Sequence, residues 1–157
     1  MPTRVKPIPE GYHAVTPYLI VRDAARAIEF YQRAFGAKEL FRMAGPGGRI
    51  EHAELQIGDS RVMLADESPE MGARSPLSIG GTPVTIHLYV DDVDAVAQRA
   101  VDAGAQLMRQ VADQFYGDRN GSVADPFGHM WWISTHKEDV SPDEMKRRVA
   151  AHHAAMS

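Results

Sequence analysis

An internal repeat limits the folds that this chain can adopt. Residues 16–23 (TPYLIVRD) align with residues 85–92 (TIHLYVDD), 69 positions further on, with Thr, Leu, Val and Asp in register. Each copy alternates between two faces, as a half-buried strand does, and each ends in an Asp that can cap a following helix. The repeat therefore predicts two copies of one supersecondary unit.

The segments that follow the two strands also repeat. Apolar residues recur at helical spacing after residue 23 and again after residue 92, and glycines at 36 and 104 end both stripes. Strands are then predicted at 38–43, 50–57 and 61–66 in the first copy, and at 106–112, 121–124 and 130–135 in the second. Gly58-Asp59 is typical of a hairpin and Asp125-Pro-Phe-Gly128 of a type I turn. Each copy thus reads β-α-β-β-β.

The predicted fold class is α+β: two βαβββ modules that form a curved mixed sheet around a cup, with a C-terminal helix. We expect a first module at 12–66, a linker at 67–83, a second module at 84–136 and a helical tail at 137–157, all within one structural domain. The tail helix opens on Ser141-Pro-Asp-Glu144, a capping box with proline in the first turn. Any function is expected where the two copies face each other.

Composition narrows the classes of partner. The chain has no cysteine, which excludes disulfides and thiolate metal sites. Its net charge is −4, and no Lys/Arg stripe indicates nucleic acid. No run approaches the roughly 18 apolar residues of a membrane helix, and the polar, proline-rich start does not resemble a signal peptide. We therefore expect a cytoplasmic protein with no nucleic-acid or membrane partner.

Strand periodicity separates a helix-covered face from a second face of mixed character. The helices should cover the apolar positions Leu19, Val21, Ala53, Leu55, Ile57, Ile86, Leu88 and Val90. The mixed face combines aromatic, histidine, carboxylate and hydroxyl groups, which predicts a ligand pocket rather than a plain solvated surface. Its expected members are Thr16, Tyr18, Ile20, His52, Glu54, Gln56, Val62, Leu64, Asp66, Thr85, His87, Tyr89, Met130, Trp132 and Ser134.

Four motifs between residues 12 and 135 carry a family resemblance. They are YLIVRD at 18–23, AIEFY at 27–31, HLYVDDVD at 87–94 and DPFGH at 125–129. A doubled βαβββ unit with these motifs resembles the vicinal-oxygen-chelate superfamily, which includes glyoxalase I, bleomycin-resistance proteins and extradiol dioxygenases. Residues 50–55, 62–67 and 115–119 are similar to its PhnB-like branch. The resemblance implies the fold above and a homodimer.

The resemblance also implies where a metal would bind. The metal enzymes of the superfamily place one ligand on each of four strands, and those positions here hold Thr16, Leu64, Thr85 and Trp132. None is a normal ligand for a divalent cation, which favours imidazole or carboxylate. A register slip of one residue would supply no ligand either, since it brings in Pro17, Met63 or Ala65, Ile86 and Ile133. We therefore predict no cofactor and no glyoxalase I metal, while a divalent metal at a displaced site stays open.

The candidate catalytic residues are His52, Glu54 and His87. His52 and Glu54 lie two apart on a strand and share a face, so they could act as an acid–base pair or, with His87, as a displaced metal site. The alternatives are a hydrogen-bonded polar pair for His52 and Glu54, and a tethered core histidine for His87.

Six residues are candidates for ligand binding. Tyr18, Tyr89 and Trp132 could line the cup as flat aromatic walls. Tyr116, Asp118 and Arg119 are expected in the loop before the seventh strand, where Arg119 could clamp a carboxylate or phosphonate and Asp118 could act as a base. The alternatives are a salt bridge between Asp118 and Arg119, or contacts across a dimer.

These observations favour a protein that binds a small organic molecule in the cup, as bleomycin-resistance proteins do, without the glyoxalase I metal. The alternative is an enzyme, namely a lyase, isomerase or dioxygenase that uses His52, Glu54 or His87. The expected partners are a small-molecule ligand and a second copy of the chain. The sequence does not decide whether the protein is an enzyme.

Overall fold

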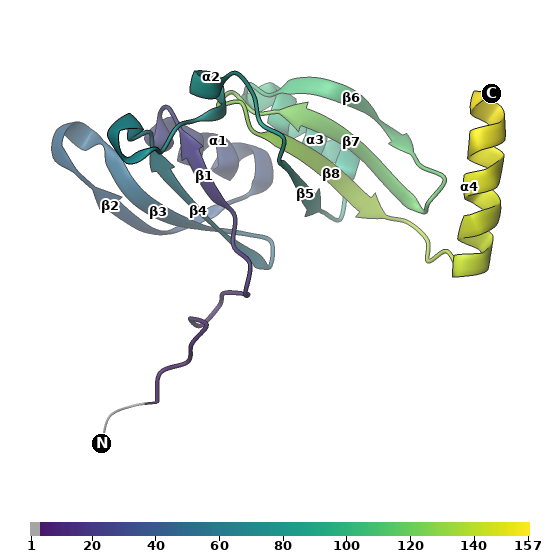
Figure 1. The fold of residues 1–157 in the computed structure, drawn as a ribbon, viewed down its shortest axis with the longest axis horizontal. Coiled ribbons are helices and arrows are strands. Elements are labelled where there is room, and N and C mark those ends of the chain that lie inside the picture. The colour runs from purple at the N-terminus through teal and green to yellow at the C-terminus, as the bar shows by residue number, and fades with distance from the viewer. Residues whose placement is uncertain (1–3) are drawn as a thin grey trace. The chain divides into compact units, whose positions relative to one another are not determined.

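The computed structural model describes residues 4–157 and contains two compact units. One unit comprises the chain up to Thr82 together with Pro126–Gly128, and the other comprises Pro83–Asp125 and His129–Ser157. Each unit has the element order β-α-β-β-β, and a further helix follows the second (Figure 1). The α+β fold with two βαβββ modules and a C-terminal helix, predicted from the repeat, is thereby confirmed.

The first unit is a four-stranded mixed sheet in the order β1-β4-β3-β2. The edge strand β1 runs parallel to β4, and the other neighbours are antiparallel. Helix α1 begins after Asp23, whose carboxylate accepts from the backbone N–H of Arg26, and ends at Gly36 in the left-handed conformation. The elements are β1 (Tyr18–Val21), α1 (Ala24–Phe35), β2 (Lys38–Ala44), β3 (Ile50–Ile57) and β4 (Ser60–Asp66).

Apolar side chains of α1 and of the three neighbouring strands form the core of this unit. Tyr31 stacks on Phe35 with 6.0 Å between ring centroids, and Phe127 from the 126–128 turn lies 6.3 Å from Phe30. Burial of such side chains is the main stabilising contribution. The core also contains Leu19, Val21, Ala27, Ile28, Ala53, Leu55, Val62 and Leu64.

The second unit repeats this plan with the strand order β5-β8-β7-β6, in which β5 and β8 are parallel. Asp92 caps α3 through the backbone N–H of Ala95. At the turn between β7 and β8, Asp125 accepts from the indole N–H of buried Trp131 at 3.0 Å. The elements are β5 (Thr85–Tyr89), α3 (Val93–Ala103), β6 (Gln106–Asp113), β7 (Asp118–Ala124) and β8 (Met130–His136).

The connection between the repeats contains local structure of its own. It includes the short helices η2 (Pro69–Met71) and α2 (Pro76–Ile79), while η1 (Pro46–Gly48) lies in the β2–β3 loop. The carboxylate of Glu67 accepts hydrogen bonds from the hydroxyls of Ser75 and Ser78 and from the Ser75 backbone N–H. These bonds lower the pKa of Glu67 to about 2. The linker is therefore held to the end of β4.

The C-terminal helix α4 (Pro142–Met156) begins at Ser141, whose hydroxyl accepts from the backbone N–H of Glu144. Arg148 reaches the backbone carbonyl of Phe115 at 3.0 Å and the carboxylate of Glu138. His152 stacks on the Phe115 ring with 4.5 Å between centroids. Within residues 4–157, no helix is long and apolar enough to cross a membrane.

The strand faces differ from expectation in β4. Val62 and Leu64 were expected on the mixed face, but they pair with Leu55 and Ala53 and are buried on the helix-covered side. The two-residue turn after Ile57 sets this register, because it pairs Ile57 with Ser60 and every later residue follows.

The opposite side of the first sheet, called the open face here, is therefore formed by a different set from β4. Asp66 is tied to the helix start and to β3, since its carboxylate accepts from the backbone N–H groups of Ala24 and Ile50. The open face comprises Tyr18, Ile20, His52, Glu54, Gln56, Arg61, Met63 and Ala65.

A second difference concerns the start of β7. The strand was expected at 121–124, but it begins at Asp118, so Asp118 and Arg119 lie in the strand and not in a loop. The register with β8 explains the extension, because Asp118 pairs with His136 and Arg119 with Thr135.

Candidate functional site

A chain of hydrogen bonds crosses the open face of the first unit. The phenol oxygen of Tyr18 lies 2.8 Å from Nδ1 of His52, and Nε2 of His52 lies 2.8 Å from Oε2 of Glu54. The hydroxyl of Tyr12 donates to the other carboxylate oxygen, Oε1. Four side chains are thus linked in the order Tyr18, His52, Glu54, Tyr12, which we call the tyrosine–histidine–glutamate chain.

The local fold explains how these residues meet. His52 and Glu54 are alternate residues of β3 and point to the same side of the sheet. Tyr18 lies on β1 at the level of Met63 on β4, and Met63 in turn pairs with Glu54. Tyr12 comes from the segment that precedes β1. The tyrosine–histidine–glutamate chain therefore joins β1, β3 and this segment.

The Tyr12 ring is held from its other side by Arg61. The guanidinium of Arg61 lies 5.2 Å from the ring centroid, in the geometry of a cation–π contact. Gly11 packs so closely on Arg61 that an added Cβ would lie 2.1 Å from Nη2. A side chain at position 11 would therefore displace the guanidinium that supports Tyr12.

The surroundings of Glu54, Tyr12 and Tyr18 determine whether each of these side chains is protonated. Hydrogen bonds from Tyr12 and His52 lower the pKa of Glu54, which is therefore a carboxylate at neutral pH. Burial and the bond to Glu54 raise the pKa of Tyr12 to about 12, and partial burial together with the Glu54 charge raises the pKa of Tyr18. Both phenols are thus protonated.

With both phenols protonated, one arrangement satisfies every polar atom of a neutral imidazole. Tyr18 donates its proton to Nδ1 of His52, and Nε2–H of His52 donates to Glu54. Of the two ring nitrogens of His52, Nδ1 is then the one without a proton, and it faces the hydroxyl of Tyr18.

A hollow of about 760 Å³ lies beside this chain within the first unit. Its walls combine apolar and charged groups, and its volume falls in the range of small-molecule sites. Tyr18 lines it, whereas His52, Glu54 and Tyr12 do not. Other lining residues are Ile20, Arg49, Glu51, Ala65 and Met71.

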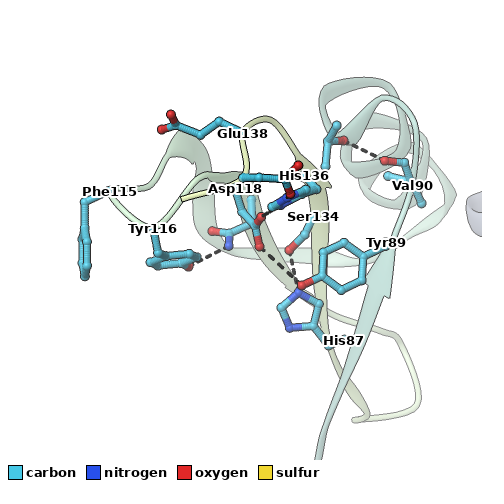
Figure 2. Close-up of polar contacts among 12 residues, drawn as sticks. His87, Tyr89, Val90, Phe115, Tyr116, Asp118, Ser134, His136 and Glu138 are labelled. Atoms are coloured by element: carbon cyan, nitrogen blue, oxygen red, sulfur yellow. Dashed lines mark hydrogen bonds and ion pairs between the residues drawn. The ribbon is translucent and has the colours of Figure 1, made fainter. Parts of the chain in front are cut away.

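The second unit carries a separate polar cluster on β5, β7, β8 and the loop before β7 (Figure 2). Buried Asp118 accepts from His136, whose Nδ1 lies 2.7 Å from Oδ1, and from the Tyr89 hydroxyl at 3.4 Å. Nε2 of His136 lies 2.8 Å from Asp139. The bond to Asp118, with a smaller contribution from Asp139, raises the pKa of His136. Asp118 therefore serves as an acceptor for its neighbours here.

His87 and Tyr116 belong to the same cluster. Nε2 of His87 lies 2.7 Å from the Ser134 hydroxyl, and the His87 ring stacks on Tyr89 with 4.9 Å between centroids. His87 is exposed, so the alternative of a core histidine is wrong. The Tyr116 hydroxyl accepts from the amide of buried Asn120 at 2.8 Å, and the amide oxygen of Asn120 has no hydrogen-bond partner among residues 4–157.

Arg119 and Trp132 have partners that the sequence did not indicate. Arg119 forms a bidentate ion pair with Asp94 of α3, at 2.8 and 2.9 Å, and a third contact to Asp113. These contacts raise the pKa of Arg119 and hold its side chain toward α3 rather than toward Asp118. The Trp132 ring is partly exposed, with the Arg109 guanidinium 5.9 Å from its centroid.

The structure thus unites some of the expected site residues and separates others. Tyr18, His52 and Glu54 form one connected set in the first unit. Tyr89, His87, Tyr116 and Asp118 form the cluster of the second unit, and Arg119 belongs to neither set. As binding or catalytic residues, all of them stay predictions.

Tyr12 and His136 are among the residues of these clusters that the sequence reasoning missed. His136 could have been found by counting outward from the turn at Asp125, because that register pairs it with Asp118. Tyr12 lies outside the repeated strands, and no sequence pattern points from it to Glu54.

The positions implied for a glyoxalase-type metal do not gather ligands. Leu64 lies on the helix-covered side, and its neighbours on the open face, Met63 and Ala65, are not ligands either. Across residues 4–157, no group of three or more His, Asp or Glu side chains could hold a metal ion. The donor set therefore does not fit a glyoxalase I metal.

Comparisons with known proteins agree with this fold. Residues 12–133 match the family model of the Glyoxalase/Bleomycin resistance protein/Dioxygenase superfamily. An uncharacterized protein of Mycobacterium tuberculosis (strain ATCC 25618 / H37Rv) is 50% identical over 141 residues, which cover 88% of this chain and 83% of the relative.

Solved structures show the same architecture. TioX from Micromonospora sp. ML1 is 29% identical with a TM-score of 0.63, over 79% of this chain and 98% of TioX. A PhnB protein from Bacillus cereus shares the fold at 14% identity with a TM-score of 0.61, over 78% and 99% of the two chains. The chain belongs to the Glyoxalase/Bleomycin resistance protein/Dioxygenase superfamily.

Proposed function

We propose that this protein binds a small organic molecule in the hollow of its first unit, without a glyoxalase I metal. The observation that carries the proposal is the hollow itself, of about 760 Å³, with the Tyr18 ring and the apolar groups of Ile20 and Ala65 in its walls. Apolar walls with a few polar groups are the usual lining of a site for small organic ligands.

The charged groups at this hollow suit a ligand with polar substituents. Arg49 is already engaged, because its guanidinium donates to the backbone carbonyl of Glu67 at 2.5 Å. Glu51 and Glu70 also line the hollow. An apolar ring against Tyr18, with polar groups toward these charges, is the arrangement that we expect.

A binding screen on two matched variants tests the proposal. Ala65→Phe fills the hollow from its wall, and Ala112→Phe makes the same change at an exposed position of β6. Small aromatic acids, amines and phenols are titrated by isothermal calorimetry. We expect saturable binding to wild type and to Ala112→Phe, and its loss in Ala65→Phe. Equal binding to all three proteins would contradict a site in this hollow.

Acid–base catalysis is the second candidate function, and the tyrosine–histidine–glutamate chain favours it. A hydrogen-bonded histidine and carboxylate is a common acid–base arrangement, and here it ends at a phenol that lines the hollow. A protein that only sequesters its ligand should tolerate His52→Ala. An enzyme should still bind its substrate but lose turnover.

Metal content and self-association are checked directly. We expect no near-stoichiometric Zn, Ni, Fe or Mn in protein purified without an affinity tag. Elemental analysis of wild type and of a His52→Ala/His87→Ala variant would contradict this if the wild type held a metal that the variant lost.

We also propose a homodimer, which sedimentation equilibrium would show as twice the chain mass of 17.3 kDa.

A further inference from the structure

Of the four residues in the tyrosine–histidine–glutamate chain, Tyr18 is the one that lines the hollow, and its hydroxyl is hydrogen-bonded to His52. We propose that Tyr18 is a catalytic base, which takes a proton from a ligand in the hollow while it passes its own phenolic proton to His52. Glu54 and Tyr12 are positioning residues for this transfer. The inference rests on the ligand-binding function proposed above and assigns the chemistry that the site performs.

The geometry supplies a path for the proton. Nδ1 of His52 lies 2.8 Å from the Tyr18 oxygen, within direct transfer distance. Nε2 of the same ring lies 2.8 Å from Oε2 of Glu54. This is the logic of a nucleophile–histidine–carboxylate triad, in which the carboxylate fixes the imidazole and balances the charge it gains.

The proton balance closes without any other group. The Tyr18 oxygen forms a bond to the ligand proton as its own proton moves to Nδ1 of His52, and the ligand keeps the electron pair. His52 becomes an imidazolium between the Tyr18 phenol and the Glu54 carboxylate. The reverse steps return the proton. The ligand class is therefore a small molecule with a weakly acidic proton, on a hydroxyl or on a carbon next to a carbonyl.

Tyr18 needs this relay because its surroundings disfavour the phenolate. Partial burial and the nearby Glu54 charge raise its pKa, so the free phenolate is scarce at neutral pH. Transfer to His52 avoids that state, since the phenol never carries a full negative charge. The relay thus lets a phenol with a raised pKa act as a base.

Contacts from Tyr12 and Arg61 keep the carboxylate of Glu54 in place. Tyr12 donates to Oε1, which leaves Oε2 for His52, and Arg61 lies over the Tyr12 ring. The charged or titratable groups in contact with one another here are Tyr12, Tyr18, His52, Glu54 and Arg61. Tyr12 therefore acts through Glu54 and His52, not on the ligand.

Tyr89 offers an internal control within the same protein. It is 61% exposed, against 48% for Tyr18, so reagents reach it at least as easily. Its hydroxyl donates directly to the carboxylate of Asp118, and the neighbouring His87 ring is hydrogen-bonded to Ser134 through Nε2.

The test uses benzenesulfonyl fluoride as a probe of phenol activation. The Tyr18 oxygen attacks sulfur, the S–O bond forms, the S–F bond breaks, fluoride leaves with the bonding electrons, and the phenolic proton passes to His52. Labelling rates at Tyr18 and Tyr89 are measured by peptide mass spectrometry between about pH 7 and 9, where phenolate from a free phenol rises about tenfold per pH unit.

We expect Tyr18 to be labelled at least about tenfold faster than Tyr89 near pH 7.5, with a rate that changes little up to pH 9. His52→Gln, which cannot accept the proton, should slow Tyr18 labelling by about a hundredfold and restore the steep pH dependence. Tyr12→Phe should slow it by a smaller factor. The Tyr89 rate should stay constant in each variant, which also reports an intact second unit.

Equal labelling of Tyr18 and Tyr89 in wild type, or a Tyr18 pH profile that His52→Gln leaves unchanged, would overturn the inference. Benzenesulfonamide, which has the shape of the probe but does not react, separates this failure from that of the proposed function. If it binds wild type but not Ala65→Phe while Tyr18 is not activated, the inference falls and ligand binding stands. If it does not bind and Tyr18 labelling does not saturate with probe concentration, both fall.

Discussion

Replacement of Leu64 tests which side of the first sheet is buried. Leu64 is fully buried, with 0% of its surface exposed, between its register neighbours Leu19 and Ala53. Leu64→Ala removes three carbons, which are worth about 2.4 kcal/mol at about 0.8 kcal/mol for each CH₂ group. The cavity left behind adds to this, so we expect a loss of about 3 kcal/mol in the free energy of unfolding.

The matched control lies next to Leu64 on the same strand. Met63 is only half-buried on the open face, so Met63→Ala should cost less than about 1.5 kcal/mol. Urea unfolding followed by far-UV circular dichroism measures both losses, and the Leu64→Ala midpoint on heating should fall by about 6–12 °C. If Leu64→Ala cost no more than Met63→Ala, the register between β3 and β4 described above would be wrong.

Four further substitutions probe a charged pair, a hydrogen-bonded carboxylate and two helix caps. The bond to Asp118 raises the pKa of His136 in the folded protein. The stability gained from protonated His136 is therefore complete below the unfolded pKa of about 6.5, and it is lost as pH rises through the folded pKa. In urea unfolding at pH 9, wild type should lose its stability advantage over His136→Gln. Glu67 has a lowered pKa, so Glu67→Gln should be less stable than wild type above about pH 5 and should match it near pH 2 in acid unfolding. Asp23→Ala and Asp92→Ala should each cost about 1 kcal/mol by thermal unfolding, because each removes the cap of one helix.

Much of the fold could be predicted because its signals are local and occur twice. The capping residues Asp23 and Asp92, the closing glycines and the two hairpin turns each reflect a short-range preference, and the repeat shows that they act together. The face of β4 could not be read from periodicity, since Met63 and Ala65 are apolar residues, as Val62 and Leu64 are. Only the pairing across the Gly58-Asp59 turn distinguishes the two sides.

The candidate site was predictable where its members share one strand. His52 and Glu54 are alternate residues of β3, so their common side follows from strand geometry. Their partners come from elsewhere: Tyr18 lies on β1, and Tyr12 in the segment before it. Contacts between distant segments depend on the three-dimensional path of the chain. Arg119 shows the same limit, because its partner Asp94 belongs to α3.

The 126–128 turn has a consequence for synthesis of the protein on the ribosome. Phe127 packs against Phe30 and Tyr31, yet it follows almost the whole second βαβββ segment in the chain. Residues 83–125 take roughly 2 to 9 seconds to translate at about 5–20 residues per second. During that time the nascent first unit lacks the Phe127 ring that packs against Phe30 and Tyr31. Phe127→Ala should therefore extend the period in which a nascent-chain protease assay finds the first unit sensitive to cleavage.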